Sequence, residues 1–265
     1  MKYAGQQFLC FLCTMQKLSV SIIAFNEESN IGRCIESVLP IADEIIVIDS
    51  YSSDRTVAIS NSFPGVTLVE NAFAGYIEQK NFAISRCRNE YILSLDADEA
   101  LSPELLQSIK QAGENFISDG YTMSRLTNYC GKWIRHCGWY PDVKMRLFNR
   151  KAVWGGINPH DKIILPAGSK ISRLKGDILH YSYNTINDHI NQIRHFTEIG
   201  AQEAYKNGVR SSFLKIIYKP KVKFIRDFIF KLGFLDGFYG YVVCYSSAFA
   251  TFLKYVRIRM LQKGK

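Results

Sequence analysis

The chain has 265 residues, of which 47% are apolar and 22% are charged. This apolar content excludes an intrinsically disordered chain, and the length is enough for one α/β domain of ordinary size with a smaller appendage. The formal net charge of +9 is uneven, because residues 1–204 hold 20 Lys and Arg against 22 Asp and Glu, whereas residues 205–265 hold 13 against 2. We therefore expect chemistry in the first part and contact with an anionic partner in the second.

The first residues carry little functional signal. Cys10 and Cys13 form a Cys-x-x-Cys pair, but no second Cys or His pair follows at zinc-site spacing, so we expect reduced thiols rather than structural zinc. The apolar stretch at residues 8–13 is shorter than a typical signal-peptide core, and no small-residue cleavage site follows it. We interpret residues 1–16 as an N-terminal extension without a functional role.

From residue 17 onward, apolar runs alternate with helix-like segments. The apolar runs predict strands at residues 18–25, 44–48, 66–70 and 91–95. Polar turns and capping residues predict helices at residues 26–38, 55–62, 76–86 and 103–115. Near-continuous apolar strands separated by helices predict a parallel sheet that is covered on both faces. Ligands of such sheets bind at the carboxyl ends of the strands, which is where the polar clusters of this chain fall.

The strongest chemical signal is the segment Leu95-Asp96-Ala97-Asp98-Glu99, at the end of the fourth predicted strand. Mg²⁺ and Mn²⁺ prefer oxygen ligands, and Mg²⁺ in particular takes only one or two protein carboxylates beside a phosphate. We predict that Asp96 and Asp98 bind such an ion, which would hold a diphosphate. The alternative is a pair of solvated loop acids that cap a helix.

Two further polar turns follow earlier strands: Ala24-Phe25-Asn26-Glu27 after the first, and Asp49-Ser50-Tyr51-Ser52-Ser53-Asp54 after the second. Together with Asp-x-Asp, this order of turns resembles glycosyltransferase family 2. The resemblance covers residues 17–255 and is closest to the lipopolysaccharide-core β-1,4-glucosyltransferase branch. It rests on these further motifs: Gln79-Lys80-Asn81-Phe82-Ala83, Gly138-Trp139-Tyr140-Pro141-Asp142, Arg146-Leu147-Phe148, His180-Tyr181-Ser182-Tyr183 and Gly233-Phe234-Leu235-Asp236-Gly237.

The resemblance implies a GT-A fold, a Rossmann-like nucleotide-binding α/β sheet, over residues 17–204. It also implies a donor site in which Asp96 and Asp98 bind ribose and metal and Lys80 approaches the diphosphate. The residues that would hold the nucleobase and ribose are Ala24, Phe25, Asn26, Glu27 and Asp49. Many relatives have Asp-Asp where this chain has Asp49-Ser50. The alternatives are turn chemistry for Asp49 and a solvated helix position for Lys80.

Inversion at an anomeric carbon by a single displacement needs a carboxylate that deprotonates the acceptor hydroxyl. Asp142 is the first acid after Asp119, follows an aromatic Gly-Trp-Tyr-Pro stretch, and matches the position of the family's catalytic base. We predict that Asp142 is the base and that Trp139 and Tyr140 contact the acceptor sugar. The alternatives are a turn acid for Asp142 and a core position for Trp139.

A cation facing the leaving group completes the predicted site. Arg146 is one candidate, and His160 is a second, because similar proteins carry a histidine after the base motif. A partly buried structural histidine is the alternative for His160. His180 has the same two interpretations, and we do not place it among the metal ligands.

The basic tail at residues 205–265 is predicted to be helical and amphipathic. Lysines and Arg226 alternate with Phe, Ile and Tyr over residues 213–231, a pattern typical of a helix on an anionic membrane surface. Residues 234–253 have about transmembrane length, but Asp236 and two glycines interrupt them, so we interpret them as an interfacial or core helix. A solvated basic face is the alternative. Nucleic acid is not an expected partner, because no recognised binding motif accompanies the charge.

The resemblance implies transfer of a hexose, glucose in this branch, from a UDP-sugar to the lipopolysaccharide inner core or a similar lipid-linked acceptor. It implies Mn²⁺ or Mg²⁺ as cofactor and a peripheral position at the cytoplasmic face of the inner membrane. One alternative is a polyprenyl-phosphate glycosyltransferase, whose phosphate nucleophile would not need Asp142 as a base. The other is a non-catalytic nucleotide-binding membrane protein, which would have no need of a separate acceptor-side acid.

Overall fold

The computed structural model describes residues 16–157 and 160–264, and its contacts divide the chain into two compact units. The first unit comprises residues up to 97 together with 103–122 and 145–176. The second comprises residues 98–102, 123–144 and 177–265. Neither unit is one continuous segment, and the predicted extension at residues 1–16 lies, apart from Gln16, outside the described residues.

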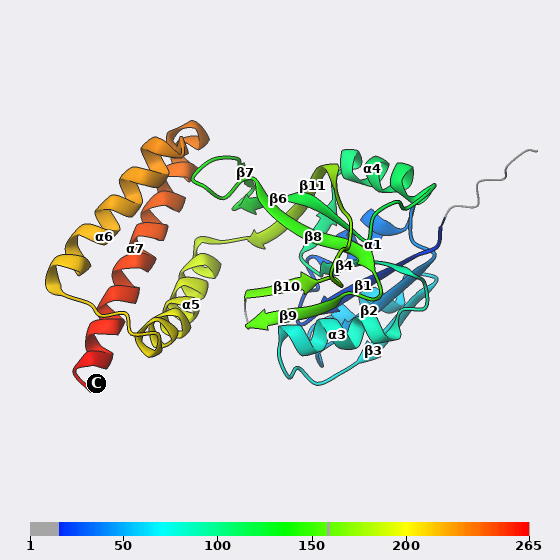
Figure 1. Ribbon diagram of the computed structural model, residues 1–265, viewed down its shortest axis with the longest axis horizontal. Helices are drawn as coiled ribbons and strands as arrows, with labels where there is room; N and C mark the ends of the chain where they lie inside the picture. The colour runs from blue at the N-terminus through cyan, green and yellow to red at the C-terminus, as the bar shows by residue number, and fades with distance from the viewer. Residues whose placement is uncertain (1–15, 158–159, 265) are drawn as a thin grey trace, which may run out of the picture. The chain divides into compact units, whose positions relative to one another are not determined.

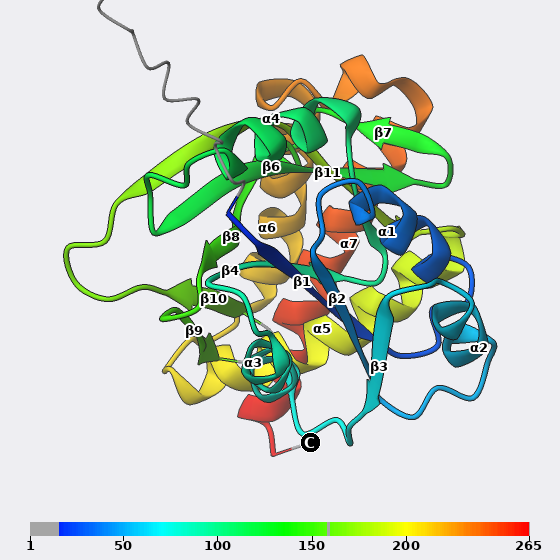
Figure 2. The ribbon, with the colours of Figure 1, turned by 90° about the vertical axis from the view of Figure 1, so that its right-hand side faces the viewer.

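The first unit is built on a parallel sheet. Its strands lie in the order β3-β2-β1-β4, which can be followed in Figure 2, and β8 adds an antiparallel neighbour to β4. The strands are β1 (Leu18–Ala24), β2 (Glu44–Asp49), β3 (Val66–Glu70), β4 (Tyr91–Asp96) and β8 (Asp142–Asn149). The parallel sheet predicted from the apolar runs is confirmed, and the predicted strand at residues 66–70 matches β3 to the residue.

Helices connect these strands, as the alternating pattern predicts. They are α1 (Ile31–Val38), α2 (Thr56–Asn61), α3 (Tyr76–Arg86) and α4 (Pro103–Gly113). The predicted helix at residues 76–86 is α3. A two-stranded antiparallel ribbon, β9 (Val153–Ile157) with β10 (His160–Ile164), completes this unit, and β9 lies against α3.

An apolar core lies between the sheet and α3. Ile48, Ile92 and Phe148 are fully buried there and pack with Ala83 of α3 and with Trp154 of β9. Full burial of a large apolar side chain stabilises a fold by about 1.5–3 kcal/mol, so this contact fixes α3 on the sheet. The carboxyl ends of the strands consequently have a rigid support.

The second unit combines short strands with three long helices. The chain enters it along β6 (Gly120–Tyr129) and β11 (Ile171–Tyr183), which run through both units. The two further strands are β7 (Lys132–Ile134), antiparallel to β6, and β5 (Glu99–Leu101), antiparallel to β11. The helices are α5 (Ile186–Lys206), α6 (Phe213–Ile225) and α7 (Gly237–Gln262).

The helices begin before the predicted tail. Thr185 and Asp188 form a capping box, which starts α5 inside the segment that we assigned to the sheet domain. Figure 1 shows α7 lying between α5 and α6, and contacts of α7 with both helices agree with this order. Two short turns, η1 (Arg226–Phe230) and η2 (Gly233–Asp236), connect α6 to α7.

An aromatic core supports the second unit. Tyr129, Tyr183 and Trp139 surround His189 of α5, whose Nδ1 lies 3.1 Å from the Tyr129 hydroxyl. Burial lowers the pKa of His189 to about 4, so this histidine is neutral at physiological pH. It is a structural residue of the core.

The helix pair also bears on membrane association. Within residues 16–157 and 160–264, no single helix is both long and apolar enough to cross a bilayer. The segments Phe213–Phe230 and Gly233–Gln262, which are bent by 72° relative to each other, reach that length and apolarity only when they are taken together.

Gly240 of α7 tests the packing of this helix pair. A Cβ at Gly240 would overlap the carbonyl oxygen of Gly233 and lie 3.0 Å from Cβ of Asp236. We expect Gly240→Ala to lower the free energy of unfolding by about 1–3 kcal/mol, as overpacked cores do. The measurement is urea denaturation of the whole chain.

Gly200 of α5 is the matched control, because a Cβ there would meet only Nζ of Lys254, at 3.8 Å. Gly200→Ala should leave stability unchanged or raise it by up to about 1 kcal/mol, the helix-propensity difference between the two residues. Equal stability of the two variants would contradict the close packing at Gly240.

Candidate active site

The first two strand-end turns of the first unit are joined by hydrogen bonds. Backbone pairing sets Ala24 opposite Asp49, so the turns after β1 and β2 meet at one edge of the sheet. The amide of Asn26 donates to Oγ of Ser52 at 2.8 Å, and the amide of Ser53 donates back to Oδ1 of Asn26, also at 2.8 Å. Asn26 has φ +54°, a left-handed conformation that Asn tolerates in turns.

The residues predicted to hold the nucleobase and ribose have different environments in these turns. Phe25 is 58% exposed, whereas Asp49 is fully buried. The two carboxylate oxygens of Asp49 accept from the amide and hydroxyl of Ser52, at 2.7 and 2.5 Å. The amide of Glu27 donates to Oγ1 of Thr56. Asp49 therefore holds the turn, its ribose contact stays a prediction, and Phe25 and Asn26 are the exposed residues of this set.

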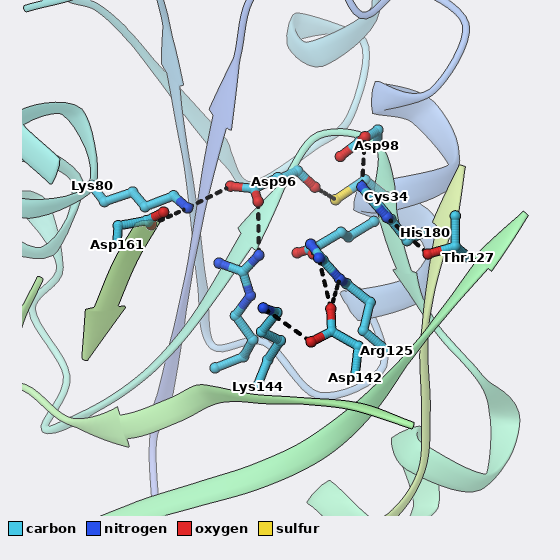
Figure 3. Close-up of polar contacts among 12 residues, drawn as sticks. Cys34, Lys80, Asp96, Asp98, Arg125, Thr127, Asp142, Lys144, Asp161 and His180 are labelled. Carbon is cyan, nitrogen blue, oxygen red and sulfur yellow. Dashed lines mark hydrogen bonds and ion pairs between the residues drawn. The ribbon is translucent and has the colours of Figure 1, made fainter. Parts of the chain in front are cut away.

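Asp96, at the end of β4, is enclosed by two cations. Nζ of Lys80 lies 3.1 Å from its Oδ1 (Figure 3). Nη2 of Arg146 lies 2.7 Å from Oδ2 of Asp96. Nζ of Lys80 is also 2.8 Å from Oδ2 of Asp161. The ring of Trp154 lies 4.5 Å from Nζ of Lys80 and 5.5 Å from Cζ of Arg146, within the range of cation–π contacts.

This cluster keeps Asp96 ionised. Burial acts to raise the pKa of Asp96, but the charges of Arg146 and Lys80 outweigh it and hold the pKa well below its usual range. Both carboxylate oxygens of Asp96 contact cationic side chains, and the predicted metal contact of Asp96 stays a prediction. Lys80 is buried, which makes the solvated-helix interpretation wrong.

Three of the predicted donor-site residues, Lys80, Asp96 and Arg146, are thus brought together, while Asp161 and Trp154 were missed. The only sequence signal for Asp161 was its place next to His160, and we assigned the function of that motif to His160. The side chain of His160 lies outside the described residues.

Asp98 pairs with a histidine in the second unit. Nε2 of His180, on β11, lies 3.1 Å from Oδ2 of Asp98, and its Nδ1 lies 3.4 Å from Oγ1 of Thr127 (Figure 3). The amide of Tyr181 donates to the carbonyl oxygen of Asp98 at 2.8 Å, which holds β11 beside this turn.

The donor atoms of this pair fit a divalent cation. Two neighbouring ligands of an octahedral ion with bonds of about 2.1 Å are separated by about 3 Å, close to the observed distance. Across the described ranges, no group of three or more His, Cys, Asp or Glu side chains is arranged around a common point. The metal contact predicted for Asp98 stays a prediction, and His180, which the sequence analysis leaves out of the metal set, is the side chain that Asp98 contacts.

Asp142, the predicted base, begins β8 and faces two cations of its own. Nη2 and Nε of Arg125 lie 2.8 and 3.1 Å from its Oδ2, and Nζ of Lys144 lies 3.1 Å from its Oδ1 (Figure 3). Burial acts to raise the pKa of Asp142, but Arg125 and Lys144 lower it below its usual value. Arg125 also lies 3.4 Å from the buried Glu99, which orients the guanidinium.

A pocket of about 420 Å³ opens in front of Asp142 in the second unit. Its wall includes Arg125, Asp142, His180, Tyr183, Gln192 and Trp139. The ring of Trp139 packs in the aromatic core and also lines the pocket, and its contact with an acceptor sugar stays a prediction. Tyr140 is not among the residues that line this pocket, and its hydroxyl donates to Oδ1 of Asp177 at 2.9 Å.

The parallel sheet, the acidic strand-end turns and a separate pocket with its own carboxylate define a glycosyltransferase of the GT-A type. Residues 19–155, more than half of the chain, match the family described as glycosyl transferase family 2. The chain belongs to glycosyltransferase family 2, and it is an enzyme of the transferase class.

Several relatives are similar over most of the chain. An uncharacterized glycosyltransferase of Rickettsia typhi is 33% identical over 93% of this chain and 88% of its own length. The lipopolysaccharide core biosynthesis glycosyltransferase LpsC of Rhizobium meliloti is 27% identical over 91% of each chain. Glucosyl-3-phosphoglycerate synthase from Mycobacterium tuberculosis, solved with Mn²⁺, uridine diphosphate and glucosyl-3-phosphoglycerate, has a TM-score of 0.36 and 21% identity over 43% of this chain and 44% of that one.

The charge cluster at Asp96 predicts a large stability effect. Asp96→Ala would remove the carboxylate that pairs with the buried cations Lys80 and Arg146. We expect the free energy of unfolding to fall by about 3 kcal/mol, as for other broken buried ion pairs. Urea denaturation at pH 7 measures it. Glu28→Ala, which breaks the exposed pair with Arg55, is the control and should cost less than about 1 kcal/mol.

The pH dependence of this effect has a defined sign. The folded-state pKa of Asp96 lies below the unfolded value of about 3.9, so its stabilisation is complete above that value and is lost only as the pH falls through the folded pKa. The stability difference between wild type and Asp96→Ala should therefore be equal at pH 8 and pH 5.5. A difference that shrinks across this range would contradict the charge cluster.

Proposed function

We propose that this glycosyltransferase moves a hexose, with glucose as the first candidate, from a UDP-sugar to a hydroxyl of the lipopolysaccharide inner core or a similar lipid-linked acceptor, with inversion. The observation that carries the proposal is Asp142, whose side chain is 33% exposed and lines a pocket of sugar size. Its two cations keep it ionised at neutral pH, the state that a general base needs.

The reaction is a single displacement. A carboxylate oxygen of Asp142 takes the proton of the acceptor hydroxyl while the hydroxyl oxygen forms its bond to the anomeric carbon. The bond from that carbon to the diphosphate oxygen breaks on the opposite side, and its electron pair leaves with the nucleoside diphosphate. Arg125 and Lys144 orient the carboxylate of Asp142 for this transfer. Because attack and departure occur on opposite faces, the configuration inverts.

The donor would be held by the strand-end turns of the first unit. Asp96 is fixed at the end of β4 by Lys80 and Arg146, which suits a ribose contact because the carboxylate cannot rotate away. Phe25 offers an exposed ring for the nucleobase. The family resemblance, in which these positions bind nucleotide, supports the assignment.

Asp98 and His180 would hold the divalent cation, Mn²⁺ or Mg²⁺. When bound, such an ion neutralises the negative charge that develops on a departing diphosphate. Only Ala97 separates Asp98 from Asp96 in the sequence, so the metal ligand and the proposed ribose contact are adjacent along the chain.

Two observations support the acceptor and the location. LpsC, which is similar over 91% of the chain, is named for lipopolysaccharide core biosynthesis. The tail carries 13 of the 33 basic residues, which suits a peripheral position on the anionic cytoplasmic face of an inner membrane. A lipid-linked acceptor would be held at that same surface.

Asp142→Asn tests the base directly. We expect it to lower acceptor-dependent UDP release by about 10²–10⁴-fold, the usual contribution of a general base. UDP release is measured from a panel of UDP-sugars with Mn²⁺ and a deacylated core acceptor, and donor binding serves as the control because it should be unchanged. Full activity of the variant on a polyprenyl phosphate would assign a phosphate nucleophile and contradict the proposal.

His180→Ala tests the cation site. Loss of one of two protein ligands should raise the Mn²⁺ concentration for half-maximal activity at least about tenfold. His195→Ala is the control, because His195 is an exposed residue of α5 that contacts Phe196. Activity that survives chelator in the wild type would exclude a metal role for Asp98 and His180.

A further inference from the structure

The outer side of α7 is entirely aromatic over four turns. Between Phe238 and Phe252, every exposed residue of this helix is Phe or Tyr, with exposed fractions from 39% for Phe252 to 70% for Phe238. These residues are Phe238, Tyr241, Tyr245, Phe249 and Phe252, and their spacing of three and four places them on one side of the helix. A helix that faces water normally has polar residues on that side.

The rest of α7 is occupied by packing within the second unit. Val243, Cys244 and Ala248 are buried on its other sides, and the helix lies between α5 and α6 in Figure 1. Tyr241 also contacts Phe224 of α6 and Phe228 of η1, with ring centroids 5.7 and 6.0 Å apart. The aromatic side of α7 is therefore continuous with apolar side chains of α6.

The turns between the two helices extend this surface. Phe230 is 77% exposed, and Phe234 and Leu235 are also exposed. We call these three residues and the five exposed aromatics of α7 the apolar hairpin face. Phe228 contacts both Phe234 and Tyr241, which connects the turn to the aromatic side of α7, and large exposed apolar patches mark interaction sites.

The exposed charges carried by residues 205–264, which include the apolar hairpin face, are of one sign. Residues 205–265 hold 13 Lys and Arg and only two acids, Asp227 and Asp236. Both acids are buried and paired internally, Asp227 with Lys223 and Arg226, and Asp236 with His136. Over residues 205–264, the solvent-facing side chains thus include cations but no carboxylate.

We propose that the apolar hairpin face lies in the interface of an anionic phospholipid bilayer. Phe and Tyr side chains would occupy the boundary between headgroups and acyl chains, and the lysines would contact lipid phosphates. An anionic bilayer can bind both the aromatic side chains and the cations, because its charged headgroups lie next to its apolar acyl chains. The 72° bend between the α6 and α7 segments suits helices that lie on one leaflet.

The hairpin also supports the pocket segment of the same unit. The carbonyl of Lys231 accepts from the amide of Cys137 at 3.1 Å, and Oδ2 of Asp236 accepts from the amide of His136 at 2.8 Å. Residues 136–142 carry Trp139 and Asp142. Bilayer binding would therefore hold the pocket near the membrane surface, where it favours a lipid-anchored acceptor; this second step rests on the proposed function.

Vesicle flotation of the full chain tests the surface without any need for activity. Wild type should float with vesicles of phosphatidylcholine and phosphatidylglycerol, and not with phosphatidylcholine alone. The variant Phe238→Ser/Tyr245→Ser/Phe249→Ser should bind at least about tenfold more weakly, because each removes apolar area from the interface. These side chains are exposed, so we expect the variant to fold, and thermal unfolding checks it.

Two further variants define the specificity. Ile117→Ser/Ile171→Ser changes comparably exposed apolar residues of the first unit and should bind vesicles as wild type does. Lys219→Gln/Lys221→Gln should weaken binding by about fivefold for each cation removed, and it should reduce the salt dependence. Equal flotation of wild type and the triple variant would overturn the proposal, as would equal binding of wild type to both vesicle types.

The oligomeric state and the acceptor preference complete the test. A stable dimer that the triple variant abolishes would assign the face to a second copy and overturn the proposal.

Wild type should use an acceptor anchored in anionic vesicles better than its deacylated form, and the triple variant should lose only that advantage. An equal loss on both acceptors would overturn the positioning step. Flotation without transfer to any acceptor would contradict the proposed function but would still support membrane binding by the apolar hairpin face.

Discussion

The parallel pairing of β1 with β2 and β4 is the constraint on which the site depends. This register sets Ala24 opposite Asp49 and Ile23 opposite Asp96, so three strand ends deliver their turns to one edge of the sheet. The apolar interior of the strands leaves no other place for these polar residues, because a buried carboxylate needs compensating partners. The edge of the sheet thus gathers the polar side chains that we propose for nucleotide binding.

The three carboxylates of the site are distinguished by what neutralises them. Asp96 lies between two buried cations and keeps its charge and orientation, whereas Asp142 is partly exposed beside Arg125 and Lys144. Asp98 faces His180 rather than a lysine or arginine, and this is the pair that we propose for the divalent cation. Residues of one chemical type therefore have different electrostatic environments, which depend on their neighbours, and the roles that we propose for them follow from this difference.

The helical part of the second unit links chemistry to location. The aromatic core around Tyr129 and His189 joins α5 to the strands, while buried Asp236 ties the start of α7 to the pocket segment. Because Asp227 and Asp236 are buried in internal ion pairs, the exposed side chains of residues 205–264 include basic and aromatic residues but no acid. The same helices therefore stabilise the pocket and present a surface suited to anionic lipid.

The parallel sheet and the helix at residues 76–86 could be predicted from the sequence, because they follow from local apolar periodicity; Asp142 could be named as a candidate base because it is a carboxylate after an aromatic turn. The burial of Lys80 and the contact of His180 with Asp98 became visible only in the folded structure. These pairings join residues that are far apart along the chain, and no periodicity or spacing encodes them. Charge compensation acts through space, so the partner of a carboxylate is known only once the strands that carry it are in register.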